Sequence, residues 1–250
     1  MYSLPAYMLG ERLNVAVIGI GGTGSAMVNE LIQLDTTLRA LDPNGGLDVT
    51  LIDGSNVTQA NIARQSFFPS QVGMNKAEAM AWTANNLYGK NFVAKPEHFE
   101  TEKHRINTDI VITALDRPSV RYQISQSTGT FLWLDMGNDA GAGQVVLGES
   151  KNTPNKTLPT ICDLYDYTQL DDSDAEIKSC SAEESLARQQ LGVNHFAARI
   201  GAQLLWNLLR HGKIDSNGAY FDVTTLRVEP LTDEDWRIHG FTPDAQKRAT

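Results

Sequence analysis

A glycine-rich loop is the first feature of the sequence that could carry chemistry. Gly19, Gly21, Gly22 and Gly24 fall in the segment GIGGTGS, between a run of β-forming residues and a helical pattern. Such a loop lets the backbone approach a phosphate, and the helix adds free N–H groups and the positive end of its dipole. We expect Gly19 to permit the tight turn, Gly21 to admit the phosphate and Gly24 to allow close helix–strand packing. The loop alone predicts a nucleotide, whether NAD, FAD or ATP.

Charged residues further along the chain narrow this choice. Asp53 ends the next predicted strand, where a carboxylate can accept hydrogen bonds from ribose hydroxyls. Arg64 and Lys76 follow, and Asp116 comes directly after a later predicted strand. A dehydrogenase has no need of two cations and a further carboxylate beside the phosphates. An enzyme that cleaves a triphosphate uses cations to stabilise the developing charge and a hard carboxylate to bind Mg²⁺.

Taken together, these motifs resemble the ThiF/HesA/MoeB superfamily, which includes the adenylating halves of ubiquitin-activating enzymes. The resemblance extends from about Val15 to Val146 and again along Cys180–Leu209. The short chain and the missing zinc-binding cysteine pairs resemble, more narrowly, the PRTRC-cassette branch. The residues that match the family pattern are the loop Gly19–Ser25, Asp53, the N-x-x-R-Q segment from Asn61 through Arg64 to Gln65, Lys76, and Asp116 with Arg121.

The resemblance implies a reaction and its participants. ATP–Mg²⁺ would be attacked at its α-phosphate by the C-terminal carboxylate of a ubiquitin-like or sulfur-carrier protein of the β-grasp fold, giving an acyl-adenylate and pyrophosphate. The resemblance also implies a homodimer, and it places the segments Asp135–Gly137 and Gly143–Val145 beside the acyl substrate. The implied roles are ribose binding for Asp53, phosphate binding for Arg64 and Lys76, Mg²⁺ binding for Asp116, and orientation near the phosphates for Asn61 and Gln65.

Structural interpretations and other functions stay open beside this one. Asp53 could cap a turn, and Asp116 could cap the helix that starts near Pro118. We expect Arg121 to form a structural salt bridge rather than to act in the reaction. Two alternative functions are a catalytically silent nucleotide-binding docking module and an NAD(P)-dependent oxidoreductase. The second would leave Arg64, Lys76 and Asp116 without a purpose.

The chain departs from the family pattern in its cysteines and at Arg117, where many relatives have asparagine. The only cysteines, Cys162 and Cys180, are too few for a disulfide scaffold or a four-thiolate zinc site, so no structural zinc is expected. Cys180 directly precedes a predicted capping box, where some relatives carry an acyl acceptor. The resemblance therefore makes Cys180 a candidate for thioester formation, although nearby acidic residues would raise its pKa. We interpret Cys162 as a structural or surface thiol.

Composition sets the class of protein. The chain has 250 residues and a formal net charge of −9, which suits one α/β domain and argues against nucleic acid or an anionic membrane as the main partner. The first residues, MYSLPAYMLGERL, lack the pattern of a secretory signal, and no apolar run reaches the length of a membrane span. We therefore expect a cytoplasmic protein.

Alternating strand and helix patterns must position these residues. They predict a Rossmann-like, doubly wound, mostly parallel sheet with helices on both faces. Predicted strands are Asn14–Ile20, Asp48–Ile52, Phe92–Ala94, Asp109–Thr113, Phe131–Asp135 and Gln144–Leu147, and Phe221–Val228 is predicted as a closing strand or hairpin arm. Predicted helices are Thr23–Leu41, Asn75–Leu87, Ser119–Ser127 and a long helix from about Ala182 to His211, kinked at Gly192.

One adenylation domain is expected over residues 1–250. An acidic excursion or crossover loop interrupts it at 149–180, and the pattern at the end of the chain, 243–250, predicts a disordered tail. In the last long helix, the row Phe196, Ile200, Leu204 and Leu208 is expected to lie on the sheet, because a four-residue step places apolar residues on one helical face.

Overall fold

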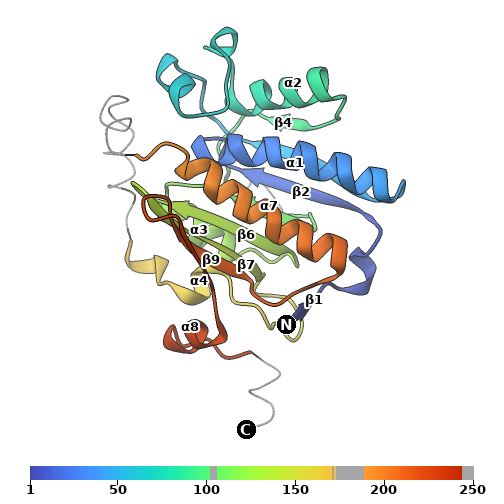
Figure 1. Ribbon diagram of the computed structural model, residues 1–250, viewed down its shortest axis with the longest axis vertical. Helices are drawn as coiled ribbons and strands as arrows, with labels where there is room; N and C mark the ends of the chain where they lie inside the picture. The colour runs from blue at the N-terminus through green and yellow to red at the C-terminus, as the bar shows by residue number, and fades with distance from the viewer. Residues whose placement is uncertain (102–105, 171, 173–188, 244–250) are drawn as a thin grey trace.

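The computed structural model describes residues 1–101, 106–170, 172 and 189–243. Its centre is an eight-stranded sheet in the order β10-β9-β7-β6-β5-β2-β3-β4 (Figure 1). The strands from β6 to β4 in this order run parallel, whereas β7, β9 and β10 extend the sheet antiparallel. Its strands are β2 (Arg12–Ile18), β3 (Gly46–Ile52), β4 (Val93–Lys95), β5 (Ile110–Thr113), β6 (Leu132–Asn138), β7 (Ala142–Glu149), β9 (Gly218–Asp222) and β10 (Arg227–Pro230).

Helices cover both faces of this sheet, which confirms the predicted fold class. Helices α1 and α7 pack side by side on one face, and α3, the crossover from β5 to β6, lies on the other (Figure 1). A small pair, β1 (Tyr2–Ser3) with β8 (Lys213–Ile214), lies outside the main sheet. The helices are α1 (Gly22–Leu41), α2 (Lys76–Tyr88), α3 (Pro118–Ser125), α4 (Ile161–Leu164), α7 (Val193–His211) and α8 (Asp233–Ile238), with 3₁₀ turns η1 (Ala6–Met8), η2 (Gln59–Ala63), η3 (Pro69–Gln71) and η4 (Tyr167–Gln169).

Helix α7 differs from the prediction at its start. Gln189 and Gln190 are not helical, and Gly192, at φ +87°, lies outside the helix as its N-terminal flank. The predicted kink at Gly192 is therefore wrong. The earlier part of the predicted helix, residues 182–188, lies outside the described residues. At the other end Gly212 closes the helix in a left-handed conformation, as the sequence predicts.

The predicted apolar row of α7 packs against the core, with Leu208 fully buried and the Phe196 ring 5.6 Å from that of Phe221 on β9, but it is not the most buried row of the helix. Phe196, Ile200 and Leu204 are only half-buried, and the fully buried residues are mostly small. A Cβ atom at Gly201 would lie 3.0 Å from the sulfur of Met136 on β6, so this helix packs closely on the sheet. The buried residues are Val193, Asn194, Ala197, Ala198, Gly201, Ala202, Leu205 and Leu208.

The segment Phe221–Val228, predicted as a closing strand or hairpin arm, is part of a hairpin of β9 and β10. The turn between them is held by Asp222, whose Oδ1 accepts hydrogen bonds from the N–H groups of Thr224 and Thr225. Within the described residues, no helix is long and apolar enough to cross a membrane.

The acidic excursion predicted at 149–180 is described at 149–170 and at 172, where it contains α4 and η4. The rest of this excursion lies outside the described residues, as does the predicted tail from 244 onward.

An ion pair between Arg121 and Asp135 is buried where α3 faces β6. Arg121 Nε lies 2.8 Å from Asp135 Oδ2, and the two residues are 6% and 0% exposed. The same carboxylate accepts a hydrogen bond from the Thr113 hydroxyl, which in turn accepts one from Trp133 Nε1. Burial alone would lower the pKa of Arg121, but the charge of Asp135 raises it above its ordinary value. The structural salt bridge predicted for Arg121 is confirmed.

Cys162 lies against this ion pair. Its Sγ is 3.6 Å from the carbonyl oxygen of Arg121. Burial, with the charge of Asp135, raises the pKa of the thiol to about 12. The side chain is therefore a protonated thiol at neutral pH, in accord with the structural interpretation of Cys162.

Asp135→Ala should destabilise the fold by about 3–5 kcal/mol, because it leaves the Arg121 guanidinium buried without its counter-charge. Urea unfolding followed by circular dichroism would measure this loss. The matched control is Asp116→Ala, which removes an exposed carboxylate and should change stability by about 0.5 kcal/mol or less. Equal losses in both variants would contradict a structural role confined to Asp135.

Candidate nucleotide-binding site

The strand order reverses at β2, and this reversal defines the candidate site. Strands β3 and β4 lie on one side of β2, while β5 and β6 lie on the other. Open α/β sheets bind their ligands outside the carboxyl ends of the strands at such a reversal. The glycine loop follows β2, Asp53 follows β3 and Asp116 follows β5, so the topology brings all three to one edge.

Two glycines of the loop are required by the fold. Gly19 has φ +88°, and a Cβ there would lie 2.6 Å from the carbonyl oxygen of Ala114. A Cβ at Gly24 would lie 1.9 Å from the carbonyl oxygen of Gly19. Gly19 thus makes the turn and Gly24 lets α1 approach the end of β2, which are the roles that their positions in the loop predict.

The other two glycines face different surroundings. No described atom lies within 4 Å of a Cβ placed on Gly21, the residue that precedes α1. A Cβ on Gly22 would instead lie 2.5 Å from Nδ2 of Asn194. Gly21 therefore leaves open space where a phosphate could reach the backbone, whereas Gly22 makes room for a protein side chain.

Asp53 holds the glycine loop in place. Its Oδ2 accepts a hydrogen bond of 2.6 Å from the N–H of Ile20, and its Oδ1 accepts one of 2.7 Å from the N–H of Ser55. Asp53 therefore caps a turn, as one of its two predicted roles requires. Each carboxylate oxygen has a second lone pair, so the same side chain can still accept a ribose hydroxyl.

Asn75 positions Lys76 beside Asp53. The side-chain oxygen of Asn75 caps α2 by accepting the N–H groups of Ala77 and Glu78. Its Nδ2 donates to the carbonyl oxygen of Asp53 at 2.8 Å. The sequence prediction placed Asn75 inside the helix and missed this role, although asparagine before a helix is a known capping signal.

Three other charged side chains act on Lys76 at this edge of the sheet. Burial lowers the pKa of Lys76 below its ordinary 10.5, the charges of Asp53 and Asp116 oppose this shift, and that of Arg64 adds to it. The structure therefore brings together the two cations and the two carboxylates that the sequence singles out.

Arg64 and Gln65 have polar atoms that the described protein leaves unpaired. Arg64 Nη1 donates to Gln189 Oε1 at 3.4 Å, but Arg64 Nε and Gln65 Oε1 are buried without a hydrogen-bond partner among the described residues. Buried polar atoms are normally paired, so a bound group is a ready explanation, and a phosphate oxygen suits the Arg64 donor. These atoms and the space at Gly21 fit a nucleotide.

Of the remaining predicted residues, the structure describes Asn61 and Asp116. Asn61 Oδ1 accepts the N–H of Thr58 at 2.9 Å and thus shapes η2. Asp116 is exposed, and the described residues hold no group of three or more metal-ligating side chains. One carboxylate suits Mg²⁺, which commonly binds through one or two carboxylates and substrate phosphates. Cys180 lies outside the described residues, so its predicted role stays a prediction.

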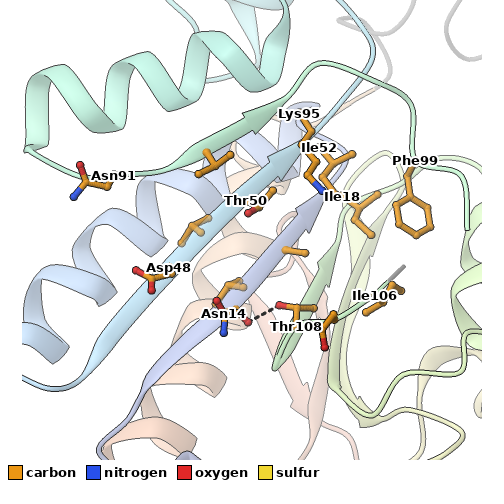
Figure 2. Close-up of a pocket in the computed structure, with 15 residues that line it drawn as sticks. Asn14, Ile18, Asp48, Thr50, Ile52, Asn91, Lys95, Phe99, Ile106 and Thr108 are labelled. Atoms are coloured by element: carbon orange, nitrogen blue, oxygen red, sulfur yellow. Dashed lines mark hydrogen bonds between the residues drawn. The ribbon is translucent and has the colours of Figure 1, made fainter. Parts of the chain in front are cut away.

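A separate cavity lies on the face of the sheet away from α1 (Figure 2). It measures about 350 Å³ and is lined by β2, β3 and β4 and by the connection to β5, with Asp48, Thr50 and Lys95 among its residues. Its lining includes neither the glycine loop nor Asp53, Arg64 or Lys76. The candidate nucleotide site is therefore distinct from this cavity.

The fold and the residues at the strand reversal define a nucleotide-binding α/β protein of the doubly wound class. The family model described as the ThiF family matches residues 10–232. The chain belongs to the ThiF family. The narrower PRTRC assignment stays a prediction. A search of curated protein sequences found no match.

Solved structures show the same fold. The chain is similar to PaaA at TM-score 0.61 and 17% identity, covering 90% of this chain and 64% of that one. It is similar to E. coli MccB with ATP at TM-score 0.57 and 15% identity, covering 90% and 64%. The microcin C7 biosynthetic enzyme MccB in complex with N-formylated MccA gives 0.58 and 14%, covering 90% and 66%. This chain thus spans slightly less than two thirds of the length of these proteins.

Gly24→Ala should destabilise the fold by about 2–3 kcal/mol, because the new methyl group would overlap the Gly19 carbonyl and force α1 away from β2. Gly21→Ala is the matched control, since its methyl group would enter open space. Thermal unfolding should separate the two variants, and only Gly21→Ala should keep the melting temperature while weakening ATP binding. A stable Gly24→Ala protein would contradict the packing role.

Nucleotide affinity should fall as pH rises through the pKa of Lys76, because only the ammonium form pairs with phosphate. This fall should begin below the pH expected for an ordinary lysine, since the pKa of Lys76 is lowered. Isothermal titration calorimetry with ATP from about pH 7 to about pH 10 would measure it, and Lys76→Arg should hold its affinity throughout because arginine stays charged. The same decline in Lys76→Arg would assign the titration to another group.

Proposed function

We propose that this protein adenylates the C-terminal carboxylate of a peptide or protein at the expense of ATP. One observation carries the proposal: the charges of Asp53, Arg64 and Asp116 act on the half-buried Lys76, and Asp53 bonds to a glycine loop that is open at Gly21. Two cations and two carboxylates suit a magnesium triphosphate better than a dinucleotide, because the charge to be stabilised lies on the phosphates.

In the proposed reaction a carboxylate oxygen of the partner attacks the α-phosphorus of ATP. The bond from that phosphorus to the bridging oxygen breaks, and pyrophosphate leaves with the bonding electrons. No general base is required, because a C-terminal carboxylate is ionised at neutral pH. Lys76 and Arg64 would neutralise charge on the phosphates, while Asp53 would orient the ribose. Asp116 would hold Mg²⁺, which neutralises phosphate charge when bound.

Family membership and the similar structures support this proposal. Among these similar structures, E. coli MccB is in complex with ATP and the microcin C7 biosynthetic enzyme MccB is in complex with N-formylated MccA, which fits a site for a nucleotide and a peptide or protein. We favour a ubiquitin-like or sulfur-carrier protein of the β-grasp fold as the partner that supplies the C-terminal carboxylate. Homodimer formation and thioester transfer to Cys180 belong to the same proposal.

A docking module that binds ATP without turnover is the second candidate. It would keep the fold and the nucleotide site, and the same charged cluster would then serve only for binding. An NAD(P)-dependent oxidoreductase is less well supported, because the Lys76 and Arg64 cations and the Asp116 carboxylate would have no part in hydride transfer.

ATP–pyrophosphate exchange with candidate β-grasp proteins and with carboxyl-terminal peptides tests the proposal. The wild type should catalyse exchange, and Asp116→Ala or Lys76→Ala should lower the rate by about 10²–10³, the usual loss when one transition-state contact is removed. Cys180→Ala should keep exchange, since thioester transfer would follow adenylation.

ATP binding without exchange, with every carboxylate offered, would instead favour the docking module. A reducible acyl adduct that forms on the wild type and is absent in Cys180→Ala would identify the acceptor. NADH binding with no ATP binding would overturn both ATP-dependent functions.

A further inference from the structure

Asn194 is the centre of a buried polar cluster that sequence analysis did not anticipate. The Asn194 cluster consists of Thr23, Asn138, Gln189 and Asn194. Thr23 Oγ1 donates to Asn194 Oδ1 at 3.0 Å, and Asn138 Nδ2 donates to Thr23 Oγ1 at 2.9 Å and to Asn194 Oδ1 at 3.0 Å. Thr23 and Asn194 are each 8% exposed. These contacts join the first turns of α1 and α7 to the end of β6.

The cluster continues to Arg64. Asn194 Nδ2 donates to Gln189 Oε1 at 3.3 Å, and the same oxygen accepts Arg64 Nη1 at 3.4 Å. A chain of side chains therefore connects the helix that begins at the phosphate loop with the cation proposed to bind phosphate. Gln189 is the link between the two.

Asn194 uses three of the four hydrogen-bonding positions of its amide within this cluster. Both amide hydrogens of Asn138 are used, and Asn194 Oδ1 accepts two hydrogen bonds. An asparagine whose oxygen and nitrogen are both committed has one orientation. Asn194 is therefore built to hold its neighbours in place, with little capacity left to bind a ligand itself.

Gly22 provides the second, independent observation. A Cβ at Gly22 would lie 2.5 Å from Nδ2, 2.7 Å from Cγ and 2.9 Å from Oδ1 of Asn194. A Cβ at Gly21 would meet no described atom within 4 Å. The glycine loop thus contains one glycine that is open on the ligand side and one that is closed by a side chain from α7.

We propose that Asn194 is a positioning residue for the nucleotide site and that residue 22 is glycine because Asn194 occupies the space beside it. Asn194 fixes the first turn of α1 against β6 and, through Gln189, fixes Arg64. The inference rests on the proposed function only in taking this site to bind ATP. It does not depend on adenylation of a partner.

A double-mutant cycle tests this coupling, with ATP dissociation constants and melting temperatures measured for Gly22→Ala, Asn194→Ala and the double variant. Each single change should weaken ATP binding about tenfold, the equivalent of one lost hydrogen bond at the upper end of its range. The double variant should bind no more weakly than Asn194→Ala, because removing the amide also removes the steric conflict with the new methyl group on residue 22. Independent effects that multiply would show that residue 22 is glycine for the ligand, and would overturn the inference.

Two further variants keep the test decisive if Asn194→Ala does not fold. Gln189→Ala, at a half-exposed position, should leave the melting temperature unchanged and weaken ATP binding, because Arg64 loses its link to Asn194. Gln203→Ala is the control: its amide bonds Asn207 on the exposed surface of the same helix, so ATP affinity should not change. Unchanged affinity in Gln189→Ala would overturn the proposed link.

These measurements separate the inference from the proposed function. If no carboxylate supports ATP–pyrophosphate exchange but ATP still binds, the proposed adenylation is wrong. The double-mutant cycle then still tests the positioning role of Asn194. If exchange proceeds and the cycle shows independent effects, adenylation stands and the positioning role of Asn194 fails.

Discussion

The contact between Gly24 and the carbonyl of Gly19 is the constraint on which the rest of the site depends. A Cβ at residue 24 would lie 1.9 Å from that oxygen, so α1 can start directly above the end of β2 only if residue 24 has no side chain. The start of α1 then carries the open backbone of Gly21 to the strand reversal. Helix α7 packs along α1 and brings Asn194 to the same place.

Segments far apart in the sequence meet at this point through a few side-chain amides and carboxylates. Asp53 bonds to the loop after β2, Asn75 bonds to the end of β3, and Asn138 bonds to α1 and α7. Asp53 and Asn75 each use one side chain to hold two backbone segments. The site is therefore held by the same bonds that fix the ends of its strands and helices.

The sequence predicted the features that local patterns encode. The glycine loop, the parallel strands and the positions of Asp53, Lys76 and Asp116 follow from spacing and composition. It could not predict Asn194, which meets Thr23 across 171 residues, because no local pattern records such a contact. The most buried row of α7 was missed for a related reason: close packing on α1 and β6 selects small residues, and these carry little hydrophobic signal. The start of α7 was missed because Gly192 was interpreted as a kink within a longer helix, whereas it is the residue that precedes α7.

The two edges of the sheet carry features that oppose pairing with a further strand. The edge strand β10 is exposed along its length, has Arg227 and Glu229, and ends at Pro230, which has no N–H to donate. The opposite edge, β4, has only three residues and ends in Lys95. Both edges thus discourage continuation of the sheet into a neighbouring molecule. Whatever this protein assembles with, the geometry favours contact through loops or helix faces over a shared sheet.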